Sequence, residues 1–66
     1  MEIKNTLIEL RKEKDLTQKQ VAQLLKMSAT GYASWEQGLA EPNLTAIKEL
    51  CKIYGVSADY LLGLEE

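Results

Sequence analysis

The chain has 66 residues, which is enough for a single domain over 1–66. It is 45% hydrophobic and 27% charged with a net charge of −2, and one cysteine without any histidine argues against an internal disulfide and a zinc site. No apolar run approaches the ~20 residues of a membrane helix and the N-terminus lacks a signal-peptide pattern, so we expect a cytoplasmic chain with no membrane partner. We also expect no metal and no cofactor.

Apolar residues recur at helical spacing along the whole chain and predict five helices, an all-α fold without strands. The first helix is predicted over Ile3 to Lys14, and Asp15 ends it before Leu16 turns into the core. Its inward-facing residues lie three or four positions apart: Ile3, Leu7, Leu10 and, at the edge of the stripe, Ile8.

The second helix has a clear start, because Thr17 and Gln20 have the S/T-x-x-E/Q spacing of a capping box. Ala22 is small enough to let a neighbouring helix approach closely. The predicted buried face of this helix comprises Val21, Leu24 and Leu25. Residues 26–28 then form a bend that separates the second helix from the third.

The third helix is predicted to begin at Ser28, a favourable N-cap, and to end where Gly38 supplies a left-handed residue. Tyr32 and Trp35 lie three positions apart, so they share a face that we predict to point inward. The opposite, outward face then carries only small side chains: Ala29, Thr30, Ala33 and Ser34.

Two further helices complete the chain, one over 43–54 with Asn43 as N-cap and a short one over 57–62 with Ser57 as N-cap. Cys51 is interpreted as a small buried hydrophobic residue, and the alternative is a reactive thiol. The apolar stripe predicted around it consists of Leu44, Ile47 and Tyr54.

Several short motifs follow one another in a characteristic order: LRKEKDLTQ at 10–18, VAQLL at 21–25, SWEQG at 34–38, Pro42, and GVSADYLLG at 55–63. Their order and spacing resemble the Xre/Cro-type helix-turn-helix family, the lambda-repressor-like DNA-binding domains of phage and bacterial regulators. The resemblance covers about residues 7–63 and implies a compact five-helix bundle in which helices two and three read double-stranded DNA. It also implies homodimers on two-fold symmetric operators.

DNA contacts are expected from two groups of residues. The family's base-reading positions fall on the outward face of the third helix: Ala29, Thr30, Ala33 and Ser34. Contacts to backbone phosphate are expected from Gln18, Lys19, Lys26 and Gln37. For Gln18 and Lys19 the alternative is an ordinary solvated helix start.

The sequence departs from the family pattern in ways that bear on DNA affinity. The outward face of the third helix has no Arg, Lys, Asn or Gln before Gln37, so it lacks a bidentate reader of guanine or adenine. The loop at 39–41 carries Glu41 in place of basic residues. Lys26 stands where the family often has glycine, and Gly31 interrupts the third helix. We therefore expect modest specificity, with DNA shape contributing to site choice.

The resemblance further implies a partly buried ion pair between Arg11 and Glu36, which would join the first helix to the end of the third. The alternative is two independent surface charges. The last helix is unusually apolar, and a homodimer interface is predicted there. The residues assigned to that interface are Tyr60, Leu61, Leu62 and Leu64. The alternative is a closing helix that only completes the core.

These features together predict a sequence-specific transcriptional regulator that binds double-stranded DNA, most simply a repressor that occupies its operator. The alternative is a protein-interaction module that keeps the helix-turn-helix scaffold, which the acidic balance and the neutral third helix favour. We predict no enzyme activity and no small-molecule ligand, because the chain has no histidine, no glycine-rich phosphate loop and no plausible nucleophile–base pair.

Overall fold

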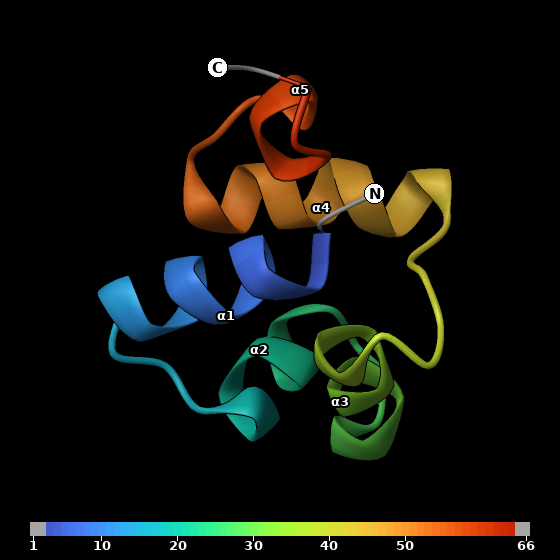
Figure 1. Cartoon of the computed structure of the whole chain (residues 1–66). Coiled ribbons are helices and arrows are strands. Elements are labelled where there is room, and N and C mark those ends of the chain that lie inside the picture. Colours follow the sequence, from blue (N-terminus) through green and yellow to red (C-terminus); the bar gives the residue numbers. More distant parts are fainter. Residues whose placement is uncertain (1–2, 65–66) are drawn as a thin grey trace.

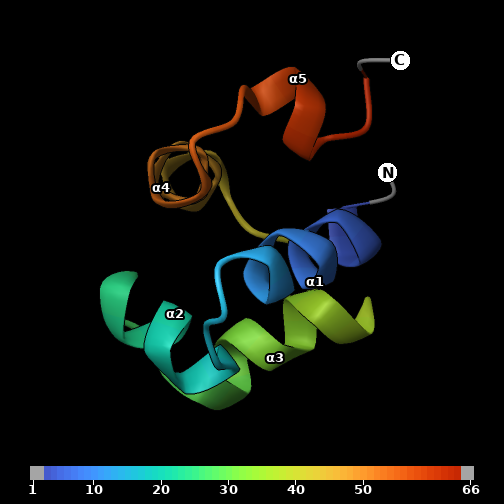
Figure 2. The ribbon, with the colours of Figure 1, turned by 90° about the vertical axis from the view of Figure 1, so that its left-hand side faces the viewer.

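The computed structural model describes residues 3–64 and contains, within them, five α-helices and no strand (Figure 1). The helices are α1 (Ile3–Glu13), α2 (Gln18–Leu24), α3 (Ala29–Gln37), α4 (Leu44–Tyr54) and α5 (Ala58–Leu61). The α1 helix is central, because it packs against α3 on one side and α5 on the other (Figure 2). The bundle thus consists of the α2–α3 pair and the α4–α5 pair, joined through α1.

Each helix from α2 to α5 begins at its predicted N-cap. At α2 the capping box is complete, since the Thr17 hydroxyl accepts from the Gln20 amide at 3.1 Å and the Thr17 amide donates to Gln20 Oε1 at 2.8 Å. The other three N-caps each accept the amide N–H three residues on: Ser28, Asn43 and Ser57. Local chemistry therefore fixes where these four helices start.

Two non-glycine residues adopt the left-handed conformation. Asp15 has φ 55° and ends α1 at Glu13, one residue earlier than predicted, because a left-handed residue cannot continue a right-handed helix. Lys26 has φ 60° in the bend between α2 and α3, where a non-glycine residue costs about 1–2 kcal/mol. The predicted C-terminal stop Gly38 is left-handed, with φ 78°, and Gly55 ends α4 in the same way, with φ 67°.

The hydrophobic core is built by residues from all five helices, with Tyr32 of α3 completely buried. The buried apolar residues are Ile3, Leu7, Leu10, Val21, Ala22, Tyr32, Leu50, Tyr54 and Leu61. The prediction that Leu24 belongs to the core is wrong, since its side chain is 56% exposed. The face of α2 that meets the core is set by Val21, Ala22 and the half-buried Leu25, and Leu24 projects about 100° away from it.

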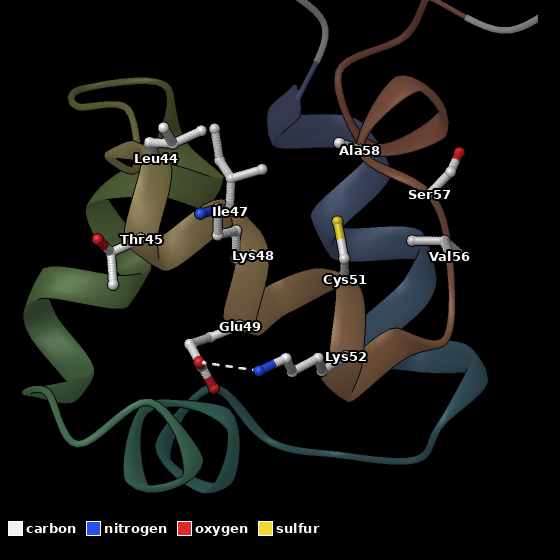
Figure 3. Close-up of a pocket in the computed structure, with 10 residues that line it drawn as sticks. All are labelled: Leu44, Thr45, Ile47, Lys48, Glu49, Cys51, Lys52, Val56, Ser57 and Ala58. Carbon is white, nitrogen blue, oxygen red and sulfur yellow. Dashed lines mark ion pairs between the residues drawn. The ribbon is translucent and has the colours of Figure 1, made fainter.

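The buried face of α4 also differs from the predicted stripe. Leu50 and Tyr54 point inward, whereas Leu44 is 69% exposed because it lies about 100° around the helix from them. Cys51 is half-buried at the edge between these faces, and burial raises the pKa of its thiol, which favours the unreactive protonated form. The outer face of α4 and the start of α5 border an open apolar groove of about 460 Å³ (Figure 3).

The short α5 helix contains one fully buried residue. Leu61 is completely buried, so the expectation that it forms part of a dimer interface is wrong. A helix of only four residues has one inward-facing position per turn, and Leu61 takes it. Its apolar neighbours Tyr60 and Leu64 remain 43% and 70% exposed, and Leu62 is half-buried.

Candidate nucleic-acid interface

The α2–α3 pair forms the side of the bundle opposite α4 and α5 (Figure 2). The bend between the two helices is fixed by backbone hydrogen bonds, in which Met27 N donates to Ala22 O at 3.0 Å and Lys26 N donates to Gln23 O at 3.1 Å. Because α3 packs mainly on α1 and α2, and reaches α4 through the buried Tyr32, its opposite face is available to a ligand. This is the geometry of a helix-turn-helix unit.

The orientation of α3 is set by its aromatic residues. Tyr32 is completely buried, and the half-buried Trp35 meets it edge to face, with ring centroids 5.9 Å apart and planes inclined by 67°. Among the predicted base-facing residues, Ala29 and Thr30 are exposed and the other two are half-buried, namely Ala33 and Ser34. None of these four side chains is enclosed by the core.

Two small residues of α3, Ser34 and Gly31, also make contacts within the helix and its N-terminal bend. The Ser34 hydroxyl donates to the Gly31 carbonyl at 2.6 Å, so in this structure Ser34 offers a ligand an acceptor only. A Cβ at Gly31 would lie 3.1 Å from both Met27 Cε and Ser28 Oγ. Glycine therefore lets the bend and its N-cap pack tightly against the first turn of α3.

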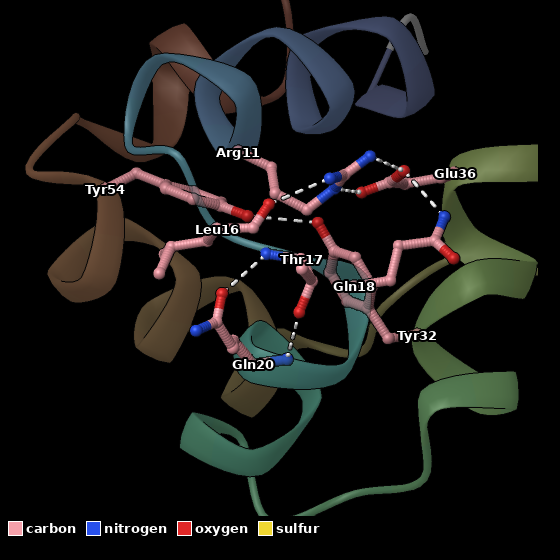
Figure 4. A network of polar contacts seen from close by, with 8 residues as sticks. All are labelled: Arg11, Leu16, Thr17, Gln18, Gln20, Tyr32, Glu36 and Tyr54. Atoms are coloured by element: carbon pink, nitrogen blue, oxygen red, sulfur yellow. Dashed lines mark hydrogen bonds and ion pairs between the residues drawn. The ribbon is translucent and has the colours of Figure 1, made fainter.

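The carboxylate of Glu36 is the centre of the polar network that holds α3 in place (Figure 4). Its side chain is only 3% exposed. The Arg11 guanidinium donates to both oxygens, from Nε to Oε2 at 2.8 Å and from Nη2 to Oε1 at 3.1 Å, so the expected ion pair is present. Nε2 of Gln18 donates to Oε1 at 2.9 Å. The carboxylate thus joins α1, α2 and α3 at one point.

Sequence reasoning missed two partners in this network. Arg11 Nη1 donates to the carbonyl oxygen of Leu16 at 2.9 Å, which ties down the turn between α1 and α2. The Tyr32 hydroxyl lies 3.0 Å from that of Tyr54, which extends the network to α4. A backbone carbonyl leaves no signal in a sequence, and the only signal for Tyr54 was its place on the apolar side of a helix.

The ionisation of the network follows from these contacts. Burial alone would raise the pKa of Glu36, but hydrogen bonds from Arg11, Gln18 and Tyr32 outweigh it and lower the pKa below its ordinary value of 4.5. The hydrogen bond to Glu36 raises the pKa of Arg11. Burial raises the pKa of both tyrosines, Tyr32 and Tyr54. At neutral pH the network therefore consists of one charged pair and two neutral phenols.

The residues expected at phosphate fall into two kinds. Gln18 is half-buried and uses one amide hydrogen to position Glu36, which leaves its second amide hydrogen for a ligand. The other three are exposed and lie at the start of α2, in the bend and at the end of α3, respectively: Lys19, Lys26 and Gln37. Within residues 3–64, neither of these two lysines forms an ion pair.

Other kinds of site have little support in the same part of the chain. Residues 3–64 contain no group of three or more Cys, Asp or Glu side chains arranged to hold a metal ion. None of the helices described there is long and apolar enough to cross a membrane.

Comparison with known proteins defines the class. The helix-turn-helix family matches residues 7–61, and the chain belongs to this family, in its Xre/Cro-type branch. The chain is 41% identical over 66 residues to the HTH-type transcriptional activator BcrR of Enterococcus faecalis, and this match covers 100% of the chain and 32% of BcrR.

The matches to two further relatives each cover about half of the relative's length. Identity is 32% over 66 residues to the HTH-type transcriptional regulator ImmR of Bacillus subtilis, covering 100% of the chain and 52% of ImmR. It is 38% over 58 residues to the cryptic phage CTXphi transcriptional repressor RstR of Vibrio cholerae, covering 88% of the chain and 52% of RstR. The chain therefore spans about a third to a half of the length of these relatives. No solved structure matches it.

Replacing Arg11 by Ala tests the network. The change leaves the Glu36 carboxylate buried without its cation and with only neutral donors beside it, so the free energy of unfolding is expected to fall by about 3–5 kcal/mol. Urea denaturation followed by circular dichroism measures the loss. The matched control is Lys12→Ala at the exposed neighbouring position, for which a change within about 0.5 kcal/mol is expected. A loss below about 1 kcal/mol for Arg11→Ala would mean that the pair behaves like a surface ion pair.

The lowered pKa of Glu36 predicts a pH dependence of folding. Because the unfolded chain binds this proton more readily, the pair stabilises the fold fully above about pH 4.5, and that contribution is lost as the pH falls through the folded-state pKa. Glu36→Gln removes the titrating group. Between about pH 6 and about pH 3, the free energy of unfolding should therefore fall less in Glu36→Gln than in the wild type. Parallel losses in urea titrations of the two proteins would contradict the assignment.

Proposed function

We propose that this chain binds double-stranded DNA as a transcriptional regulator, with α3 inserted in the major groove. The observation that carries the proposal is the orientation of α3, whose aromatic residues face the core while Ala29 and Thr30 are exposed. A helix with small side chains can approach base edges closely, and Thr30 offers a hydroxyl to base edges and a methyl to thymine. Membership of the helix-turn-helix family supports the same conclusion.

In the proposed complex, base reading comes from Ala29, Thr30, Ala33 and Ser34, and the phosphates are bound by Gln18, Lys19, Lys26 and Gln37. None of the base-facing residues makes a bidentate contact, so each base pair contributes little and DNA shape contributes to the choice of site. We propose repression by occupancy of the operator. RstR is named a repressor and BcrR an activator, so a reporter gene behind the selected site distinguishes the two outcomes.

A second candidate is a protein-interaction module on the same scaffold. It is favoured by the net charge of −2 and by the absence of any cation on α3 itself. Selection of bound fragments from random DNA, followed by titration at several salt concentrations, separates the two candidates. DNA binding weakens steeply with salt because counterions are released from the phosphates, whereas an apolar protein interface does not.

We further propose that the chain acts as a homodimer through the exposed apolar residues that follow α4. Tyr60 and Leu64 are 43% and 70% exposed, and the half-buried Leu62 lies between them. Burial of such side chains in a symmetric contact removes apolar surface from water. A dimer also places two copies of α3 on successive half-sites of one DNA face, about one helical turn apart.

Ala29→Asp tests the reading face. The new carboxylate meets DNA phosphates and base acceptors, so affinity for the selected site should fall by about a hundredfold. Asp is favourable in the first turn of a helix, so the fold should keep its stability or gain about 0.3–1 kcal/mol. Thr45→Asp is the matched control because it adds the same charge to the first turn of α4, where DNA affinity should stay near that of the wild type. Equal affinity for wild type and Ala29→Asp would exclude this face.

Leu64→Lys tests the dimer. Sedimentation at tens of micromolar should give a dimer for the wild type and a monomer for Leu64→Lys, because a charge opposes burial of the contact. Leu39→Lys is the control, since Leu39 is an equally exposed apolar side chain, at 78%, in the loop after α3. A wild-type monomer, or an unchanged dimer in Leu64→Lys, would rule out the proposed contact.

A further inference from the structure

The reading helix and its flanks have an unusual shortage of positive charge. From Met27 to Ile47 the chain contains no Lys or Arg, but it contains Glu36 and Glu41. The charge of Glu36 is matched by Arg11, whereas Glu41 is exposed. A protein in the major groove meets a phosphate strand on either side and needs cations for both. Lys26 precedes the beginning of α3, but neither α3 nor the following loop contains a Lys or Arg that could lie at the C-terminal end of the helix.

The structure brings a lysine from another helix to that end. Lys4 lies in the first turn of α1, and the beginning of α1 lies close to the end of α3 (Figure 2). A Cβ built on Gly38 would lie 3.1 Å from Lys4 Cδ and 3.5 Å from Lys4 Nζ. Because glycine has no side chain, the Lys4 stem packs directly onto the C-cap of α3. Lys4 also borders a small cavity of about 170 Å³ together with Trp35, Gly38 and Glu41.

The ammonium group of Lys4 is not committed to a protein carboxylate. The residue is exposed, and within residues 3–64 it takes part in no ion pair, although Glu41 borders the same cavity. A cation at this place is favoured by the negative end of the α3 dipole. That interaction holds the charge beside the end of α3 and leaves the ammonium hydrogens available to another anion.

We propose that Lys4 is the phosphate-binding cation at the C-terminal end of α3, the counterpart of Lys26 at its beginning. This inference rests on the proposed DNA-binding function and adds a contact residue to it. The nine residues of α3 span about 13 Å, which is close to the ~12 Å width of the major groove. Lys26 and Lys4 lie beyond opposite ends of this helix, so in the proposed complex each can contact a different phosphate strand at the border of the groove.

The experiment compares Lys4→Gln with the wild type on the DNA fragment selected above. Gln keeps most of the stem that packs on Gly38 and removes the charge. The plot of log affinity against log salt should become shallower by about 0.9, the value for one lost phosphate contact. Affinity should also fall by a similar factor on cognate and unrelated DNA, because phosphate contacts carry no sequence information. The double variant Lys4→Gln, Lys26→Gln should lose about 1.8 from the slope if both contacts exist.

The matched control is Lys48→Gln, an exposed lysine on α4 that forms no ion pair within residues 3–64 and should leave the slope unchanged. A wild-type slope in Lys4→Gln, with steep salt dependence in the wild type, overturns the role of Lys4 and leaves the proposed function standing. Lower thermal stability of Lys4→Gln at an unchanged slope also overturns it, since Lys4 would then act only on the end of α3. A wild type that binds no DNA at any salt concentration overturns both proposals.

Discussion

The buried carboxylate of Glu36 is the constraint on which the rest of the structure depends. A charge that is 3% exposed is tolerated only when donors surround it, and here Arg11 and Gln18 supply three hydrogen bonds. Arg11 in turn binds the Leu16 carbonyl. The position of α3 is thus fixed by this charged group, whose partners lie on two other helices, together with the aromatic residues that face the core. A shift of α3 would leave the carboxylate buried without its donors.

The same constraint explains what α3 presents to solvent. With Glu36 and Tyr32 fixed on the inside, the first turn of α3 is left with Ala29 and Thr30 outside. Such a surface can come close to DNA, but it offers few groups that distinguish one base pair from another. In the proposed complex the affinity must then come from cations at the ends of the helix. One of these, Lys26, adopts a left-handed conformation that costs about 1–2 kcal/mol. Strained backbone conformations of this kind are often found at functional sites.

The half of the bundle formed by α4 and α5 presents an incompletely buried apolar surface and borders an open apolar groove. Leu61 is the one fully buried residue of α5, while Leu44, Tyr60 and Leu64 leave a large share of their apolar surface in water. A domain of this size is only marginally stable. Association that buries these side chains would therefore stabilise the fold, and it would also pair two reading helices. Folding and the proposed dimerisation are therefore linked by the same residues.

The sequence by itself determined the helix starts, because an N-cap is a local interaction between residues three apart: Thr17, Ser28, Asn43 and Ser57 all act as predicted. The Arg11–Glu36 pair could be expected only from the family resemblance, since its partners are 25 residues apart. Which leucines are buried was decided by the tertiary structure. Leu24, Leu44 and Leu61 are all apolar at helical spacing, and only the directions of the neighbouring helices leave the first two in water and enclose the third.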